Sequence, residues 1–486
     1  MSQCERASNT SYEADLAVIG GGGAGLSAAV AAVEKGAKVI VLEARSIPGG
    51  NSVYPLGFFA VDTRQMSESK IAASQDNLFL QAMRYTHWKT NSRLMRTLIE
   101  KSGDTIRWFE DKGLQFEPLE ITPGNPIPMF IPHKTGPGKG GAQVVRTLVK
   151  ACQDLGVTTL CHTRARKLLT DRNGRLTGAI AITQDREFTI QAKSLVVSTG
   201  GFAGNQTLLK KLFPSYNENE VHLAGLPHQG DGMRLVSEIG ADINGAVVIE
   251  MNGPEFPWSW NISTMCKHPG TLWVNKRGER FTSEAVSAVF PEAANSLFRQ
   301  PGKMSYTLFD EPLKRSMFVE EIDPLARHMI TSPDWEYQSD QDFQSQAEKA
   351  RVKKADSWEA LAQWMEIDTK TLETTLGEYN TCCEQQHDHL FAKEAGYLRP
   401  LRTPPYYAIK CCINFFVTHG GIKTNHRMEV LDRNDLPIQG LYAAGVDTEG
   451  TDSDTYNYAL PGHSLGFSLN TGRIAGENAA EFSLSK

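Results

Sequence analysis

The cysteine spacings that usually bind metals and clusters are missing from this sequence. None of its eight cysteines forms a C-x-x-C or C-x-x-x-x-C pair. This argues against a zinc knuckle, an iron–sulfur cluster or a redox-active disulfide, because each needs such a pair. We predict no metal site, including at His387 and His389, and ordinary buried thiols at the two vicinal pairs. The cysteines are Cys4, Cys152, Cys161, Cys266, Cys382, Cys383, Cys411 and Cys412.

The chain also lacks a basic run and a long apolar run. Its formal net charge is -6, so we expect no nucleic-acid partner. No stretch approaches the ~18 continuous apolar residues of a membrane span. The polar start has no basic segment followed by an apolar one, as a secretory signal would. The sequence therefore predicts a cytoplasmic protein without a membrane span.

What the chain does have is length and an ordinary globular composition. It contains 486 residues, of which 40% are hydrophobic and 22% charged. A chain of this size can bury a large core and exceeds the usual size of one domain. We expect two domains.

Near the start, a strand, a glycine-rich turn, a helix and a second strand follow in order. The stretch ADLAVIGGGGAGLSAAVAAVEKGAKVIVLEA contains G-x-G-x-x-G at Gly20, Gly22 and Gly25. These glycines allow a tight turn, a close approach of pyrophosphate to the backbone and close helix packing. Glu43 ends the second strand, where a carboxylate accepts hydrogen bonds from a ribose. The pattern predicts a dinucleotide site, with the phosphates at the helix N-terminus.

Three further stretches carry a family resemblance. ARSIPGGNS follows Glu43, and SLVVSTGGFAGN and GLYAAGVDTEG come far downstream. They resemble the FAD-binding signatures of the fumarate reductase and succinate dehydrogenase flavoprotein superfamily. The resemblance runs from about residue 14 to the end of the chain and includes GKGGAQVVRTLVKACQDLGV, QGDGMRLVSEIGADI, VNKRGERFTSE and THGGIKTNHRMEVLD.

This resemblance implies an α/β fold with two parts. A discontinuous Rossmann-like FAD-binding domain is expected at residues 12–245 and 418–486, with an inserted α+β capping domain at 246–417. The substrate is expected between the cap and the flavin ring. Within the cap, Asp356–Ser357 before WEALAQWM predicts a helix start.

The resemblance also implies which residues contact FAD. Respiratory members of the superfamily carry a histidine that bonds covalently to the flavin, but GGNSVYPLG has none. We therefore expect non-covalent FAD. The helix that begins near Ser464 is expected to point its N–H groups at the flavin. The matching positions are Gly20, Gly22, Gly25, Glu43, Gly49, Gly50, Asn51, Ser52, Ala165, Gly200, Gly445, Ser464 and Leu465.

The substrate-binding side chains of a fumarate reductase are missing. Aligned on the family pattern, the proton-donating arginine falls at Ala288 and the carboxylate-binding arginine at Ala459. The family histidine falls at Val417, although His419 lies two residues away. Because a buried carboxylate without a cationic partner is costly, fumarate is not the expected substrate.

The residues that stand in this place are similar to the ketosteroid dehydrogenase branch of the superfamily. TYNYALPGHS places Tyr458 four residues before Gly462. In that branch, a tyrosine hydroxyl and a glycine N–H at this spacing bind the ketone oxygen of the substrate. Two such donors polarise an enone and stabilise the enolate that forms on hydride transfer.

Other side chains are candidates for moving the proton. Tyr456, Tyr406 and Tyr407 could pass a proton to or from the substrate carbon, and His419 and His463 flank the same region. The stretches GPEFPWSWN and YPLGFF are candidate aromatic walls for a flat apolar molecule.

The sequence thus predicts an FAD-dependent oxidoreductase that moves hydride between the flavin and a carbon–carbon bond beside a carbonyl, with a ketosteroid-like or other flat enone as substrate. Electrons are expected from an external donor or to an external acceptor, since no C-x-x-C-H haem motif is present. One alternative is an enzyme for a small carboxylic acid, held by Arg399 and Arg402. Another is an electron-transfer subunit of a larger complex. The oligomeric state is left open.

Overall fold

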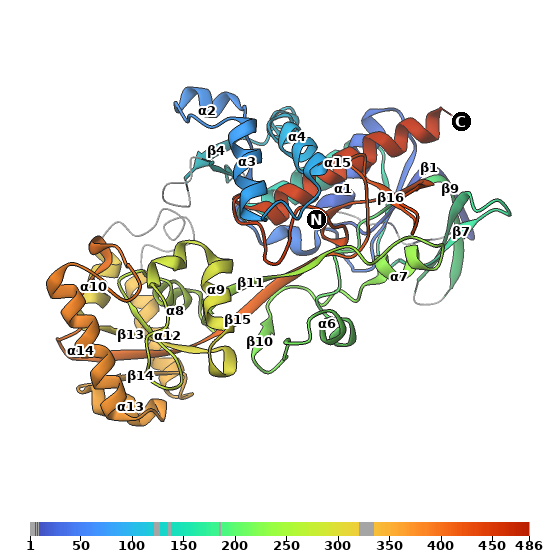
Figure 1. Ribbon diagram of the computed structural model, residues 1–486. Helices are drawn as coiled ribbons and strands as arrows, with labels where there is room; N and C mark the ends of the chain where they lie inside the picture. Colours follow the sequence, from blue (N-terminus) through green and yellow to red (C-terminus); the bar gives the residue numbers. More distant parts are fainter. Residues whose placement is uncertain are drawn as a thin grey trace.

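The computed structural model describes residues 5, 7, 9–120, 127–134, 138–183, 186–319 and 335–485. Two lobes are visible in Figure 1. One contains both the blue N-terminal segment and the red C-terminal helix, and the other contains the yellow and orange middle of the chain.

The first lobe is built on an eight-stranded sheet. Its path runs β16-β17-β9-β1-β2-β6, with β8 pairing to β9 and β7 pairing to β8. The β1 strand pairs in parallel with β2 and β9, and its Leu16–Ile19 segment is buried, as expected for a sheet covered on both faces. The strands are β1 (Ser11–Ile19), β2 (Val39–Leu42), β6 (Thr158–Leu160), β7 (Arg164–Thr170), β8 (Leu176–Ile182), β9 (Glu187–Val197), β16 (Glu429–Leu431) and β17 (Pro437–Ala443).

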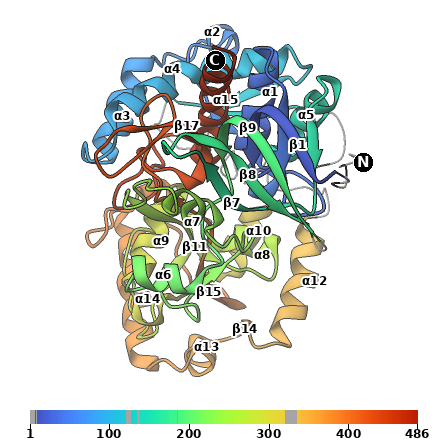
Figure 2. The ribbon, with the colours of Figure 1, turned by 90° about the vertical axis from the view of Figure 1, so that its right-hand side faces the viewer.

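Distant parts of the chain meet in this sheet. The β17 strand pairs in parallel with β9, although more than two hundred residues separate them. The C-terminal helix α15 (His463–Leu484) packs along α1 (Gly23–Glu34), the helix that follows the glycine turn. Figure 2 shows α15 beside α1 above the sheet. The expected discontinuous α/β lobe is therefore present.

Further elements surround this sheet. They comprise a small three-stranded sheet, in the order β3-β5-β4, and helices on the faces. They are α2 (Arg64–Glu68), α3 (Gln75–Tyr85), α4 (Ser92–Glu110), α5 (Gly141–Asp154), α6 (Gln206–Leu212), α7 (Asp231–Ser237), β3 (Phe58–Phe59), β4 (Phe116–Leu119) and β5 (Met129–Pro132), with short 3-10 turns η1 (Gly50–Val53) and η5 (Gly445–Asp447).

The cap lobe is organised around one long strand, β15 (Tyr406–Gly420). It pairs with β10, β11, β13 and β14, and β13 pairs with β12. The other strands are β10 (Val221–Leu223), β11 (Val247–Glu255), β12 (Leu272–Val274), β13 (Ser305–Asp310) and β14 (Val352–Ala355). The helices are α8 (Trp260–Cys266), α9 (Phe290–Phe298), α10 (Glu311–Val319), α12 (Trp335–Ala347), α13 (Trp358–Met365) and α14 (Thr369–Gln385), with 3-10 turns η2 (Glu284–Ala288), η3 (Pro301–Lys303) and η4 (Ala395–Tyr397).

The strands β11 and β15 join the two lobes, as Figure 1 shows. Their pairing runs from Val247 opposite Gly420 to Glu255 opposite Cys412. The predicted boundary at 417/418 falls inside β15, so the strand pairing does not mark a break there. The predicted helix start in the cap is confirmed, since Ser357 accepts a hydrogen bond from Ala360 N at 3.2 Å as α13 begins.

Candidate active site

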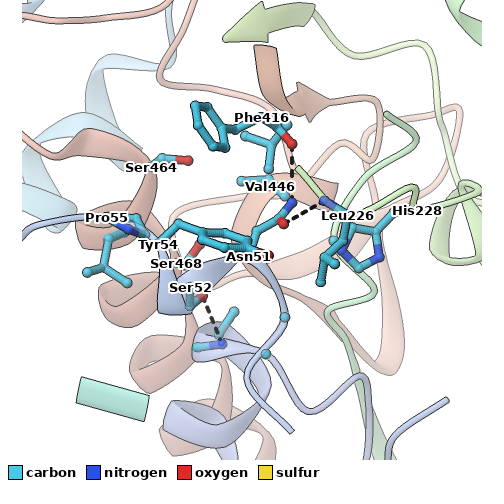
Figure 3. A pocket seen from close by; sticks show the side chains of 18 of the residues that line it. Asn51, Ser52, Tyr54, Pro55, Leu226, His228, Phe416, Val446, Ser464 and Ser468 are labelled. Atoms are coloured by element: carbon cyan, nitrogen blue, oxygen red, sulfur yellow. Dashed lines mark hydrogen bonds between the residues drawn. The ribbon is translucent and has the colours of Figure 1, made fainter. Parts of the chain in front are cut away.

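A cavity of about 810 Å³ extends from the glycine turn of the first lobe to the cap. Its walls come from α1, η1, the start of α15, the strands β11 and β15 and the cap helices α8 and α9. A cavity of this size between two lobes is a common location for a ligand. Figure 3 shows its central part from close by.

The glycine turn is shaped to receive phosphates. Gly20 has φ of 106°, and a Cβ on Gly25 would lie 1.9 Å from Gly20 O, so neither position tolerates another side chain. Helix α1 then begins after Gly22, where no side chain caps it and where a Cβ would have nothing within 4 Å. The helix start therefore faces open space with its positive end. This matches the pyrophosphate of a dinucleotide such as FAD.

Glu43 is held ready for a ribose. Its Oε2 accepts a hydrogen bond from Gly21 N at 2.9 Å and its Oε1 one from Arg45 N at 2.7 Å. The side chain is buried and lines the cavity. These two backbone donors fix the carboxylate in place, and its remaining lone pairs are available to ribose hydroxyls.

Asn51 connects three segments around the expected flavin position (Figure 3). Its Oδ1 accepts from Leu226 N at 2.9 Å, and its Nδ2 donates to Phe416 O at 3.2 Å. The neighbouring Ser52 Oγ accepts from Gly23 N at 3.1 Å, at the first turn of α1. The G-G-N-S motif thus joins the glycine turn to β15 and to the segment after β10.

Two side chains of the cofactor region were not predicted from the sequence. Asp447 accepts hydrogen bonds from the backbone of Thr199 and Gly201 and so fixes the S-T-G-G turn. His228 lies against Gly200, and burial followed by the nearby Arg45 charge lowers its pKa from the ordinary value. Asp447 lies in the G-V-D-T-E-G motif, but no local pattern indicates His228.

Most predicted cofactor positions lie on the cavity wall. Gly25 and Gly49 support the turn from outside it, since Gly49 N donates to Gly21 O at 2.8 Å. The wall contains Gly20, Gly22, Glu43, Gly50, Asn51, Ser52, Ala165, Gly200, Gly445, Ser464 and Leu465.

The N-terminus of α15 reaches the cavity through Gly462. This residue has φ of 68°, and a Cβ on it would lie 2.3 Å from Gly57 O. In the next turn, Ser464 N donates to the Tyr456 hydroxyl oxygen at 2.8 Å. This N–H is therefore already engaged and is not available to a flavin, contrary to the simplest expectation for the helix start. Tyr456, Tyr458 and Gly462 all line the cavity.

A charged cluster extends from Glu250 on the cavity wall to buried residues behind it, and we call it the histidine cluster. It consists of His419, Asp452, His463 and Glu250. His419 Nε2 lies 2.9 Å from Ser464 Oγ and 3.5 Å from Glu250 Oε2, and His419 Nδ1 lies 3.2 Å from Asp452 Oδ2. His463 Nε2 lies 3.4 Å from the same Asp452 oxygen.

The carboxylates of this cluster hold His419 in its charged form. Burial alone would lower the pKa of His419, but Asp452 and Glu250 outweigh it and raise this pKa to about 9. Burial would raise the pKa of Asp452, but His463 and His419 hold it well below its usual range. The ligand atoms of His419, Asp452 and His463 also lie within 4.8 Å of one another, close enough for a metal ion, so the absence of a metal stays a prediction.

The cap side of the cavity has a polar wall. Glu250, Asn252 and Glu255 from β11 line it together with Asn414 from β15. Lys267, which directly follows α8, also lines it and forms an ion pair with Glu255. An adjoining part of the wall is apolar, because Met129, Tyr456 and Tyr458 belong to one hydrophobic cluster with Phe290 packed against it.

The aromatic stretches contribute only in part. Tyr54 and Trp260 line the cavity, whereas Phe58 and Phe59 are fully buried in the core of the first lobe. Phe290, which no pattern indicated, packs on Tyr458 with ring centroids 6.0 Å apart.

Four of the side chains predicted as candidates for moving the proton lie away from the cavity wall. Tyr407 lies in the cap core, stacked on Phe309 at 5.0 Å and donating to Glu311 Oε2 at 2.6 Å, and it does not line the cavity. Tyr406 donates to Arg402 O at 2.9 Å and is also outside the cavity wall. His419 and His463 lie behind the wall rather than on it.

The arginines offered for a small carboxylic acid are also elsewhere. Arg402 forms an exposed ion pair with Glu384, and Arg399 donates to Gly396 O at 2.9 Å on the surface. Neither lines the cavity, and the expected arginine positions Ala288 and Ala459 do not line it either.

Within the part of the chain that the structure describes, no helix is both long enough and apolar enough to cross a membrane.

Comparisons with known proteins agree with this site. The family model "FAD binding domain" matches residues 15–465. A vinyl phenol reductase of Lactiplantibacillus plantarum is 30% identical over 491 residues, covering 96% of each chain. The solved structure of the open conformation of a flavocytochrome c3 fumarate reductase superposes with a TM-score of 0.76 at 26% identity, covering 97% of this chain and 79% of that one.

A further solved structure shows the same fold. It is a 3-ketosteroid-delta4-(5alpha)-dehydrogenase of Rhodococcus jostii in complex with 4-androstene-3,17-dione, with a TM-score of 0.76 at 23% identity over 96% of this chain and 97% of that one. The glycine turn, the anchored Glu43 and the family match lead to one conclusion: this chain belongs to the FAD binding domain family and is an FAD-dependent oxidoreductase that acts on carbon–carbon double bonds.

Proposed function

We propose that the protein reduces a carbon–carbon double bond conjugated to a neutral oxygen-bearing group, such as a ketone or a phenol. The observation that carries this proposal is the charge of the cap side of the cavity. Glu250 and Glu255 line it, and Lys267 is already paired with Glu255. A substrate that carries a carboxylate would bring a further negative charge to this net negative part of the wall. A neutral substrate avoids that electrostatic cost.

The other basic side chains of the cavity wall do not change this balance. Arg45 lies two residues after Glu43, the carboxylate that we assign to the ribose, and is therefore on the cofactor side of the cavity. Arg164 forms an ion pair with Asp231 at 2.9 Å. Lys139 is exposed. A neutral alkene also agrees with the substrate name of the vinyl phenol reductase and with the enone bound by the ketosteroid dehydrogenase.

FAD, once reduced by an external electron donor, would supply the hydride for such a reduction. The protein positions the acceptor. Tyr458 and Gly462 both line the cavity, and we assign their O–H and N–H groups to the oxygen of a ketone conjugated to the double bond. Two such donors stabilise the negative charge that develops on a ketone oxygen as hydride arrives.

The histidine cluster supplies the proton. His419 is charged at neutral pH and contacts Ser464 Oγ and Glu250 Oε2, both of which belong to cavity-lining residues. Either group can carry the proton from His419 to the substrate carbon. Tyr456 positions Ser464 by accepting a hydrogen bond from its backbone N–H.

The first test is anaerobic. The purified protein is reduced, and the return of oxidised flavin absorbance is followed after adding a 3-keto-4-ene steroid, 4-vinylphenol or fumarate. Rapid reoxidation by a neutral alkene and none by fumarate supports the proposal. Rapid reoxidation by fumarate would contradict it. Turnover by the purified chain alone would also argue against an electron-transfer subunit.

The Tyr458→Phe variant tests the assigned donor. Loss of one hydrogen bond to the developing charge is expected to lower the rate of enone reduction about 100-fold. Tyr54→Phe, which changes another tyrosine of the cavity wall, is the matched control and is expected to keep the rate. An unchanged rate in Tyr458→Phe would remove this hydroxyl from the mechanism.

A further inference from the structure

One side chain of the polar wall has an oxygen that no described residue satisfies. Asn414 is 6% exposed and lines the cavity, and its Oδ1 is buried without a hydrogen bond to any residue that the structure describes. A buried amide oxygen without a donor is costly, and native structures usually satisfy such an atom with protein, water or ligand. Asn414 therefore offers an acceptor to a molecule that occupies the cavity.

The surroundings of Asn414 define the shape of that molecule. On β11, Asn252 lies directly opposite Asn414 and Glu255 lies opposite Cys412, with a β-bulge in β11 between the two pairs. Asn414 and Cys412 are alternate residues of β15, so they share a face of the strand and lie about 7 Å apart. Asn414 and Glu255 therefore line neighbouring parts of the cavity wall.

The ion pair between Glu255 and Lys267 is held in position by further contacts. Ser263 Oγ donates to Glu255 Oε2 at 2.5 Å, and Lys267 binds Oε1. The Lys267 ammonium also lies 4.7 Å from the centroid of the Phe290 ring, and Phe290 packs on Tyr458. This end of the cavity therefore combines an aromatic surface, a cationic donor and an unused acceptor.

These observations indicate which chemical group of a ligand would bind at this site. A hydroxyl can donate to the Asn414 oxygen and accept from the Lys267 ammonium, whereas an ether lacks the donor and a hydrocarbon lacks both. The aromatic surface of Phe290 and Trp260 suits a ring that carries the hydroxyl. We propose that Asn414 and the Glu255–Lys267 pair form a subsite that binds the hydroxyl group of a phenolic alkene. This inference rests on the proposed function and adds the substrate class to it.

The test compares a phenol with its methyl ether, so that the ring oxygen carries either a hydrogen or a methyl group. The rates of reduction of 4-vinylphenol and 4-methoxystyrene are measured with the FAD-loaded protein and a reduced dye as electron donor, and a 3-keto-4-ene steroid is measured beside them. We expect KM to be about tenfold lower for the phenol than for its methyl ether, the size of one unmet buried hydrogen bond. Equal KM values for the two substrates overturn the subsite.

Variants of the polar wall test which residues cause the preference for the phenol over its methyl ether. Asn414→Leu is expected to bring the ratio of the two KM values to about one by weakening only the binding of the phenol, since a leucine cannot accept a hydrogen bond. Thr307→Val is the matched control, because Thr307 is a buried polar residue of the same sheet outside the cavity. A tenfold ratio that persists in Asn414→Leu overturns the assignment.

A second variant covers the case in which Asn414→Leu does not fold. Lys267→Met is expected to raise KM more for the phenol than for its methyl ether, and Lys303→Met, which breaks the Lys303–Glu220 pair outside the cavity, is the control. Equal effects of Lys267→Met on both substrates overturn the subsite. If no neutral alkene is reduced, the proposed function itself fails. If the steroid or the methyl ether is reduced without any preference for the phenol, only the subsite fails.

Discussion

At the residue scale, His419 shows how a charge is kept on a buried side chain. The residues that face it come from three segments: Glu250 from β11, Asp452 from the loop before α15, and His463 and Ser464 from α15 itself. Burial would neutralise an isolated histidine, and it is the pair of carboxylates that reverses this effect. His419 is therefore a proton store that depends on residues far apart in the sequence.

The stability of the protein is expected to depend on this charge. The pKa of His419 is about 9 in the folded protein and about 6.5 when unfolded. Its contribution is therefore complete below pH 6.5 and is lost as the pH rises through 9, with a size of order 3 kcal/mol. Denaturant unfolding between pH 7 and 10 measures it. His419→Gln is expected to flatten the pH dependence, while His426→Gln, at a partly exposed histidine of the same segment, keeps it.

The functional role of a residue could be predicted where the residues of a site follow one another along the chain. The glycines of the first turn and Glu43 follow one another along the chain, and a phosphate and ribose site needs that order. Asp452, Glu250 and Asn414 could not be predicted, because each acquires its role from its position beside another element. No short pattern indicates such a neighbour.

At the element scale, the start of α15 determines the geometry of the active site. Gly462 takes a left-handed conformation beside the Gly57 carbonyl, and the helix begins directly after it. The first turn then presents Ser464 and Leu465 to the cofactor side of the cavity. The P-G-H-S motif predicts a helix here, but the engagement of Ser464 N by Tyr456 depends on tertiary packing.

Gly462→Ala is therefore expected to be costly. An alanine in this conformation is strained by about 1 kcal/mol, and its Cβ would also meet Gly57 O at 2.3 Å. We expect a loss of about 2 kcal/mol or more of folding free energy, together with a shifted flavin absorbance spectrum. Denaturant unfolding and absorbance measure both. Gly377→Ala, at an open position inside α14, is the control and is expected to leave the spectrum unchanged and to stabilise the fold by about 0.5–1 kcal/mol, because alanine favours a helix over glycine. A fully stable Gly462→Ala with a native spectrum would contradict this role.

The length of β15 explains why the location of Tyr407 could not be predicted from its position in the sequence. The T-P-P-Y-Y-A-I-K stretch opens the same strand that ends near His419, which suggests that its tyrosines lie near the flavin. Because β15 is fifteen residues long, its two ends lie in different lobes. Tyr407 pairs opposite Phe309 in the cap sheet, while His419 pairs opposite Val248 behind the cavity wall.

At the scale of the whole molecule, the α/β lobe and its assembly from two segments could be predicted, because strand, turn and helix patterns and the ordered motifs are themselves local. The contacts inside the cap could not be predicted from the sequence. The V-N-K-R-G-E-R-F-T-S-E motif contributes a buried ion network there, in which Arg280 and Lys393 bind Glu284 at 2.8 and 3.0 Å. Lys393 comes from more than a hundred residues downstream, so the motif alone does not show the network.

FAD is expected to leave the protein when it unfolds. The G-G-N-S segment offers no histidine for a covalent bond, and Asn51 and Ser52 use their side chains in hydrogen bonds to the protein. After heat denaturation and ultrafiltration, the yellow colour should pass into the filtrate. Excess FAD should also stabilise the fold, by about 2.7 kcal/mol at a hundred times its Kd. Colour retained by the denatured chain would show a covalent bond instead.

The length of β15 has a consequence for how this enzyme can change. One strand carries Asn414 on the wall at the cap end of the cavity and His419 behind the wall at the helix end. Between Phe415 and Thr418 this strand already has one residue more than its partner β11, so a β-bulge separates the two ends. A further single insertion would need a second bulge, because otherwise it would turn the following side chains to the opposite face. The distance between the two ends of the cavity is therefore difficult to change in small steps. A gradual shift to longer or shorter substrates has to come from the walls, through side chains such as Phe290 and Trp260.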